Sequence, residues 1–238
     1  MTPHQGHLEA ESPQDFAARL GLPIEDFLLL SRALTHRSYL NEHPEALEDN
    51  ERLEFLGDAV LDYVVGLWLY NRFPEMAEGD LTRLRAALVN TDQLAKFGME
   101  IHLGDALLLG KGEEENGGRI RRAMLCGAFE ALIGALVIDA GMEEVTRFVS
   151  PLLEQATVKI LQNHEDKDPK SLLQEYVQSG GDPAPVYEVI SESGPDHAKV
   201  FEVEVFANHR HLGRGMGNSK QLASMNAAND ALSRIKQD

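Results

Sequence analysis

The sequence predicts an all-α domain followed by a small α+β domain whose elements run α-β-β-β-α. Three observations support this prediction. Apolar residues recur at helical spacing over the first two thirds of the chain. Residues 162–168 are all polar or charged and precede Pro169, which indicates a linker. Residues 200–207 then alternate in the way that is typical of a half-buried antiparallel strand.

The length and composition fit this two-domain organisation. The chain has 238 residues, of which 43% are hydrophobic. A chain of this length usually forms one or two domains, and this apolar content is ample for packed cores. We expect an N-terminal tail over residues 1–11, a helical domain over 12–161, a linker over 162–168 and the α+β domain over 169–238.

The helical domain can be divided by its local signals. Pro23 and the two acidic residues that follow it mark the start of a helix over 24–34. Further helices are expected over 50–73, 78–97, 119–140 and 143–161. Pro74 ends the first of these. The glycine- and glutamate-rich residues 110–118 are expected to form a solvated loop, and no strand is expected before residue 160.

The second domain shows a different pattern. A helix is expected at its start and another at its end, with three strands between them. The expected helices cover 170–178 and 219–235, and the expected strands cover 185–191, 200–207 and 210–215. This order gives a small α+β domain.

Charge and cysteine content narrow the function. The net charge is −17, which argues against a generic basic nucleic-acid binder and against a membrane-surface protein, although a locally basic face is still allowed. The single cysteine, Cys126, excludes an intrachain disulfide and disfavours a cysteine-based zinc site. No signal peptide and no apolar run of about 20 residues is visible, so we expect a soluble cytoplasmic protein.

Acidic residues stand out in two apolar helical segments. Glu51, Glu54 and Asp58 share one helix face, and Glu130 is the one acid in an apolar run. Helices that are apolar almost all round are usually buried. A buried carboxylate is costly unless it is paired or binds a metal ion, and hard oxygen ligands suit Mg²⁺ or Mn²⁺. The spacing alone leaves two interpretations open, a metal site or an ion pair with Arg52, Arg83 or Arg85.

The residues 50–61, Asn-Glu-Arg-Leu-Glu-Phe-Leu-Gly-Asp-Ala-Val-Leu, resemble the signature of the ribonuclease III family. Further matches in the same order cover 34–38, 78–80, 110–119 and 128–134, and the resemblance runs from about residue 15 to 235. It implies the ribonuclease III fold and hydrolysis of double-stranded RNA to 5′-phosphate and 3′-hydroxyl ends, in the processing of rRNA and mRNA precursors. It also implies Mg²⁺, with Mn²⁺ as a substitute, and a homodimer. The glycine-rich run lacks P-loop spacing, so no nucleotide cofactor is expected.

The resemblance also implies roles for individual residues. The metal ligands would be Glu54, Asp58 and Glu130, with Asp58 and Glu130 as the catalytic residues. Glu51 and Glu78 match further acidic positions that face the cleavage groove.

One position departs from the family. The family usually carries an aspartate three residues before the glutamate that Glu130 matches, and this chain has Gly127 there. The alternative function is therefore a duplex-RNA-binding protein whose metal site is weakened or inactive. Retention of the other carboxylates favours the enzyme, because an inactive site has no physical reason to keep them.

The second domain resembles the double-stranded-RNA-binding domain, through residues 168–176, 194–197 and 217–220. The implied RNA-binding residues are Gln174, Glu175, His197 and Lys220. Side chains of this kind can reach the 2′-hydroxyls and phosphates of A-form RNA. The family usually has two lysines where this chain has Lys220 and Gln221, and residues 168–238 carry a net charge of −3. We therefore expect modest, strongly salt-dependent binding.

Overall fold

The computed structural model describes residues 10–46, 48–163, 168–195 and 198–235. The chain forms two compact units, residues 1–163 and 164–238, each with its own core. Most of the expected tail and linker lies outside the described residues. In the described part of the chain, no helix combines the length and the apolar character needed to cross a membrane.

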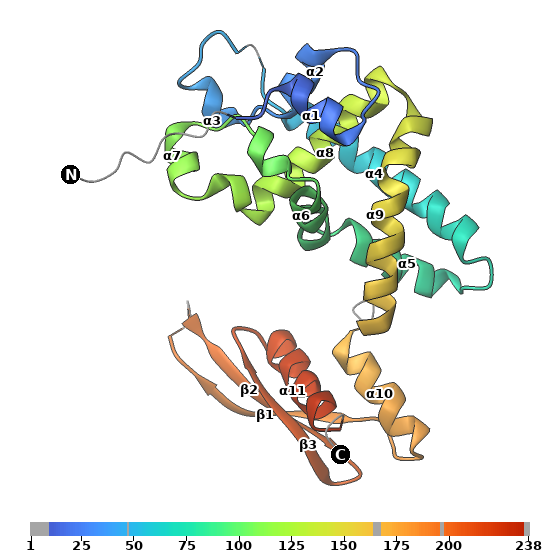
Figure 1. Ribbon diagram of the computed structural model, residues 1–238. Coiled ribbons are helices and arrows are strands. Elements are labelled where there is room, and N and C mark those ends of the chain that lie inside the picture. The colour runs from blue at the N-terminus through green and yellow to red at the C-terminus, as the bar shows by residue number, and fades with distance from the viewer. Residues whose placement is uncertain (1–9, 47, 164–167, 196–197, 236–238) are drawn as a thin grey trace. The chain divides into compact units, whose positions relative to one another are not determined.

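The first unit is helical (Figure 1). Its α-helices are α1 Pro13–Leu20, α2 Phe27–Ala33, α3 Arg37–Leu40, α4 Glu51–Arg72, α5 Glu78–Val89, α6 Thr91–Glu100, α7 Lys111–Glu115, α8 Arg122–Asp139 and α9 Met142–Asn163. Two short 3₁₀ helices, η1 Leu103–Ala106 and η2 Gly118–Ile120, connect α6 to α7 and α7 to α8. Among the described residues before α10, the one β-bridge joins Thr35 to Leu108, so no strand forms there.

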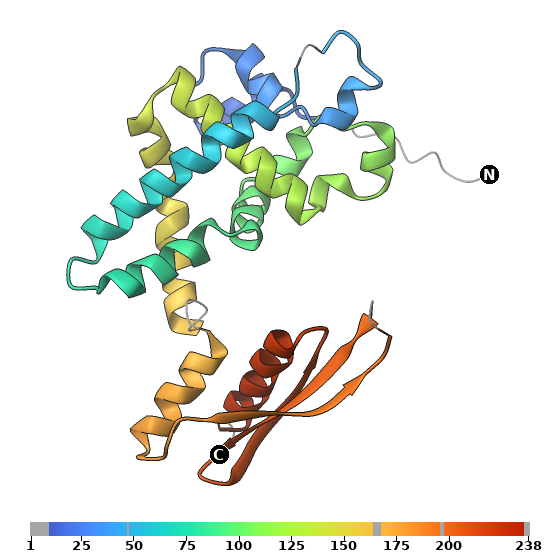
Figure 2. The ribbon, with the colours of Figure 1, turned by 180° about the vertical axis from the view of Figure 1, so that it is seen from behind.

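Helix α8 is the centre of this unit. Every residue from Leu125 to Phe129 and from Ala131 to Leu136 is buried. Helices α4, α6, α2 and α9 contact it, and α4 crosses it (Figure 2). Asp139, at its last turn, accepts hydrogen bonds from the backbone N–H groups of Glu25 and Asp26, at 2.6 and 3.1 Å. This carboxylate joins the end of α8 to the start of α2.

The structure confirms the long predicted helices at α4, α8 and α9 and corrects several others. The helix expected over 78–97 is two helices, because Asn90 has an extended backbone and its side chain caps α6 by accepting from Gln93 N–H at 2.9 Å. The expected loop over 110–118 contains α7 and the start of η2. Helix α1, which begins after the N-cap Ser12, was not predicted.

The expectation that α4 is buried all round is wrong. Its buried residues, Leu53, Gly57, Val60, Leu61, Val64, Val65 and Leu69, lie on the side that packs into the core. The opposite side is open, and the Phe55 side chain is 81% exposed. The apolar pattern of α4 therefore reflects one core-facing side and one exposed apolar side.

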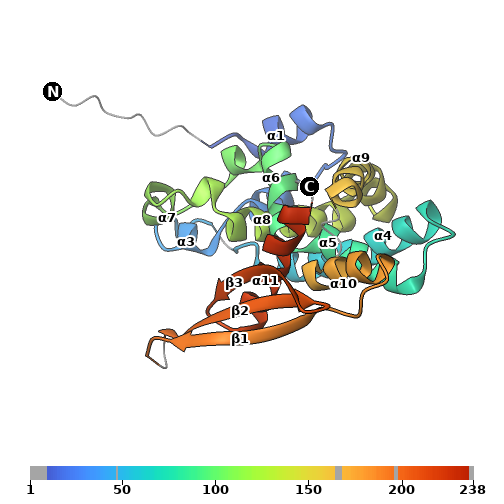
Figure 3. The ribbon, with the colours of Figure 1, turned by 90° about the horizontal axis from the view of Figure 1, so that it is seen from below.

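The second unit has the predicted order. It consists of α10 Pro169–Ser179, β1 Val186–Ser193, β2 Val200–Ala207, β3 Arg210–Gly217 and α11 Lys220–Ile235. The strands form an antiparallel sheet in the order β1-β2-β3, and β3 is as long as its neighbours rather than shorter as expected. Helix α11 packs on β2 and β3, with α10 beside it (Figure 3). Alanines of α11 contact glycines of β3, which brings this helix close to the sheet.

Candidate active site

Two glycines allow α4 and α8 to cross in direct backbone contact. A Cβ atom at Gly57 would overlap the backbone carbonyl of Glu130, and one at Gly134 would overlap the carbonyl of Leu53. Gly57 lies between Glu54 and Asp58 along α4. The crossing therefore brings the two α4 carboxylates beside Glu130 of α8.

The carboxylates at this crossing influence one another's ionisation. Burial, then the charges of Glu54 and Asp58, raise the pKa of Glu130 to about 7. Burial, then the charges of Glu51 and Asp58, raise the pKa of Glu54. Glu54 and Glu130 are half-buried, whereas Glu51 and Asp58 are exposed. Glu54, Asp58 and Glu130 thus form one negative cluster that opens to solvent on the side of Asp58.

The ion-pair interpretation of these carboxylates receives no support. Among the ion pairs of the described residues, none includes Glu54, Asp58 or Glu130. Arg83, one of the expected partners, pairs with Asp80 instead. The negative cluster is therefore not neutralised by arginine.

Cys126 is a neighbour of the cluster that the sequence analysis missed. Its thiol donates to Glu130 Oε1 over 3.6 Å. Burial, then the charge of Glu130, raise the pKa of this thiol to about 12, so it is a neutral donor. The i, i+4 spacing of residues 126 and 130 on one helix was the signal that could have revealed this contact.

The donor set fits a hard divalent cation in its chemistry. It consists of carboxylate oxygens in a half-buried setting, where mutual repulsion favours a bound cation. Within the described ranges, however, no three His, Cys, Asp or Glu side chains lie close enough together to hold a metal ion by themselves. A site built on these residues would leave several coordination positions to water, which Mg²⁺ commonly keeps.

Of the two accessory acids, Glu51 lies at the edge of this cluster and Glu78 lies away from it. Glu51 is exposed and pairs with Arg37, 3.4 Å from Nη1 to Oε1. Glu78 begins α5 and accepts from the Thr82 hydroxyl at 3.2 Å. At 1.5 Å per residue, α4 separates Glu54 from Arg72, the last residue of the helix, by about 27 Å, and α5 begins beyond that end. Within one chain, Glu78 does not join the cluster.

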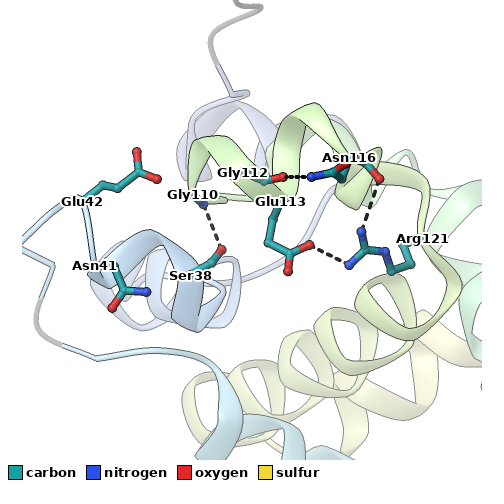
Figure 4. Close-up of a pocket in the computed structure, with 8 residues that line it drawn as sticks. All are labelled: Ser38, Asn41, Glu42, Gly110, Gly112, Glu113, Asn116 and Arg121. Atoms are coloured by element: carbon teal, nitrogen blue, oxygen red, sulfur yellow. Dashed lines mark hydrogen bonds and ion pairs between the residues drawn. The ribbon is translucent and has the colours of Figure 1, made fainter.

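A polar pocket of about 640 Å³ lies between α3 and the segment around α7 (Figure 4). Ser38 Oγ accepts from Gly110 N–H at 2.9 Å, and Arg121 pairs with Glu113 at 2.6 Å. The acids of this segment were expected to be solvated, but Glu114 also pairs, with Arg119. Arg121 is the one basic residue lining the pocket and is engaged by Glu113, so the pocket is not suited to phosphate.

The candidate RNA-binding residues lie on the helices of the second unit, except His197, which lies outside the described residues. Gln174 and Glu175 are exposed on α10, where Gln174 donates to Gln178 at 3.3 Å. Lys220 is exposed at the start of α11, and its Nζ lies 5.6 Å from the centre of the Phe201 ring. Cation–π contact of this kind orients a lysine without neutralising it.

Comparisons with known proteins identify both units. Residues 26–156 match the family described as Ribonuclease-III-like, and residues 169–235 match the double-stranded RNA binding motif. Ribonuclease 3 of Enterococcus faecalis is 46% identical over 220 residues, which cover 92% of this chain and 95% of the relative. The chain belongs to the ribonuclease III family. Ribonuclease 3 of a Roseiflexus species is 43% identical over 229 residues, covering 95% of this chain and 97% of the relative.

A solved ribonuclease III structure agrees with this assignment. The nuclease domain of ribonuclease III from Campylobacter jejuni is 44% identical, covers 60% of this chain and 93% of its own, and superposes with a TM-score of 0.54. Its coverage is that of a nuclease domain alone. This ribonuclease III family chain therefore combines a helical nuclease domain with a C-terminal double-stranded-RNA-binding domain, and it is a double-stranded-RNA endoribonuclease. The comparisons do not favour the inactive alternative over this function.

Proposed function

We propose that this protein is a divalent-metal-dependent endoribonuclease that hydrolyses double-stranded RNA to 5′-phosphate and 3′-hydroxyl ends. The observation that carries the proposal is the crossing of α4 and α8, which gathers Glu54, Asp58 and Glu130 without an arginine partner. The same chain carries a double-stranded RNA binding motif. We further infer that its substrates are rRNA and mRNA precursors. The cytoplasmic location stays a prediction.

Glu54, Asp58 and Glu130 would hold the metal ion, and Asp58 and Glu130 would act at the scissile phosphate. When bound, Mg²⁺, or Mn²⁺ in its place, supplies an activated water and stabilises charge on the leaving oxygen. Glu130 would give up its proton when the cation binds, because its pKa of about 7 leaves it partly protonated near neutral pH. The half-buried Glu54 and Glu130 would fix the ion against α8, and the exposed Asp58 would line the solvent side.

The second unit would bind the duplex by its shape. Gln174 and Glu175 are exposed on α10 and could hydrogen-bond 2′-hydroxyls, while Lys220 at the start of α11 could contact phosphate. His197 is a further candidate for RNA contact and lies outside the described residues. Because this domain has a net charge of −3, binding would depend on these few contacts and weaken steeply with salt.

We also propose that the protein is a homodimer that pairs through α4. Phe55, Tyr63 and Tyr70 on this helix are 81%, 58% and 71% exposed, which is unusual for large apolar side chains in a monomer. A second structure of the Campylobacter jejuni nuclease domain is described as flexible in the region involved in its dimer formation. Two copies would supply two negative clusters, one for each strand of a duplex.

The direct test is incubation of the full chain with a long perfect RNA duplex at low salt, with Mg²⁺ or with a chelator. We expect cleavage that needs the metal and is lost in Glu130→Gln, with duplex binding unchanged in that variant. Sequencing of the product ends should show 5′-phosphates. Tight binding without cleavage by the parent protein would instead establish the alternative, a duplex-RNA-binding protein.

A further inference from the structure

The carboxylate of Glu54 lies directly over the backbone of Gly127. A Cβ atom placed on Gly127 would stand 2.8 Å from Glu54 Oε2 and 3.0 Å from its Cδ. The first distance is shorter than real Cβ contacts and the second is at their tight limit, so a side chain at position 127 would shift this carboxylate, which ends a flexible side chain. In its observed position, the Glu54 carboxylate therefore occupies the space on α8 that a Cβ atom at position 127 would take.

Helix packing does not explain this glycine. Gly57 and Gly134 meet the backbone of the opposite helix, whereas the nearest atoms to a Cβ at Gly127 all belong to the Glu54 carboxylate group. A glycine inside a helix is destabilising relative to alanine. Gly127 thus destabilises the central helix relative to alanine. The group that takes the space of its missing side chain is the Glu54 carboxylate.

We propose that Gly127 is a positioning residue that seats the Glu54 carboxylate on α8 beside Glu130. The inference rests on the proposed metal site and concerns how this chain builds it. Glu54 takes space at the position where the family usually carries an aspartate. A side chain at 127 and the seated Glu54 then exclude each other, so Gly127→Asp exchanges one carboxylate for another instead of adding one.

The test compares Mn²⁺ affinity and metal-free stability in the full-length protein. Gly127→Ala should weaken Mn²⁺ binding, measured by calorimetry, about tenfold or more, because the ligand loses its support. Its melting temperature in chelator should equal or exceed that of the parent, since alanine favours the helix. The matched control is Gly66→Ala on α4, where a Cβ would meet only Arg85 at 3.9 Å. It should have the parent's Mn²⁺ affinity.

A double variant tests whether the two residues act together. Glu54→Gln should lose Mn²⁺ affinity by at least as much as Gly127→Ala, and combining the two should add no further loss. Glu54→Asp leaves α8 unchanged but shortens the side chain by one methylene, so it should also bind Mn²⁺ more weakly.

Three results would overturn the inference. They are parent-like Mn²⁺ affinity in Gly127→Ala, parent-like affinity in Glu54→Asp, and additive losses in the double variant. In each of these cases the proposed metal site would survive, because the parent binds. Absence of Mn²⁺ binding by the parent itself would overturn both the inference and the metal dependence in the proposed function.

Discussion

Gly57 on α4 packs against the backbone carbonyl of Glu130 on α8, with no room for even a methyl group between them. This contact places a candidate catalytic residue of one helix beside the turn of the other helix that carries Glu54 and Asp58. The site therefore needs Gly57 as well as its acidic residues. This glycine directly precedes Asp58 in the signature and allows α4 to approach α8 closely enough to bring the carboxylates together.

Replacing Gly57 by alanine should push the two helices apart. The obstructing atom is backbone, which cannot rotate away as a side chain can. Overpacking of a core contact usually costs about 1–3 kcal/mol, and we expect the upper part of that range or more. The free energy of unfolding measured in urea and the rate of RNA cleavage should both fall. Gly66→Ala on the same helix should leave the free energy of unfolding unchanged or raise it. Full activity in Gly57→Ala would show that the close crossing is dispensable.

Without metal, Glu130 should make stability depend on pH. Its pKa of about 7 lies above the value of 4.5 expected for an unfolded chain, so the folded protein holds this proton more tightly. The resulting contribution to the free energy of unfolding is present below about pH 4.5 and is lost as pH rises through about 7. After allowance for solvent screening we expect a loss of roughly 1–2 kcal/mol.

Urea unfolding in chelator, at about pH 5 and about pH 8, measures this effect. The parent should lose stability relative to Glu130→Gln between the two conditions, because glutamine does not titrate. An equal pH dependence in both proteins would mean that Glu130 ionises as an ordinary surface acid.

The exposed side of α4 should hold the dimer. Phe55→Glu places a charge on a side chain that is 81% exposed in the single chain, so it should leave the fold intact and break the association. Light scattering should then report a monomer. Ile120→Glu, at a 75% exposed position in η2, is the matched control and should remain dimeric. A dimeric Phe55→Glu variant would place the interface elsewhere.

Lys220 should contribute one phosphate contact. Duplex-RNA affinity measured against salt concentration should fall less steeply in Lys220→Gln, with the slope of log affinity against log salt reduced by about 1. Lys96→Gln, which removes an exposed lysine from α6 in the other unit, should leave the slope unchanged. If the two variants behave alike, Lys220 does not touch the phosphate backbone.

Many helices and strands of this protein could be predicted from the sequence, because the patterns that specify them lie within short segments of the chain. The 3.6-residue period placed the acids of α4 on one face, and strict alternation gave the β2 strand its observed limits. Other features depend on tertiary contacts. The break at Asn90 needed knowledge of its side-chain cap, and periodicity alone could not separate the core side of α4 from its exposed apolar side.

The site shows the same division. The sequence indicated which carboxylates to consider, but the seat of Glu54 on Gly127 appears only when two helices are brought together. In the sequence, Gly127 indicated only that a metal ligand was missing. In the fold, the Glu54 carboxylate occupies the space beside this glycine.

The most direct measurement of the central claim is a crystal structure of the full chain grown with Mn²⁺, using anomalous scattering to locate the metal. We predict a peak at the crossing of α4 and α8, with oxygen atoms of Glu54, Asp58 and Glu130 at ligand distance and water completing the coordination. Manganese bound elsewhere, with this crossing empty under conditions that support RNA cleavage, would contradict the account.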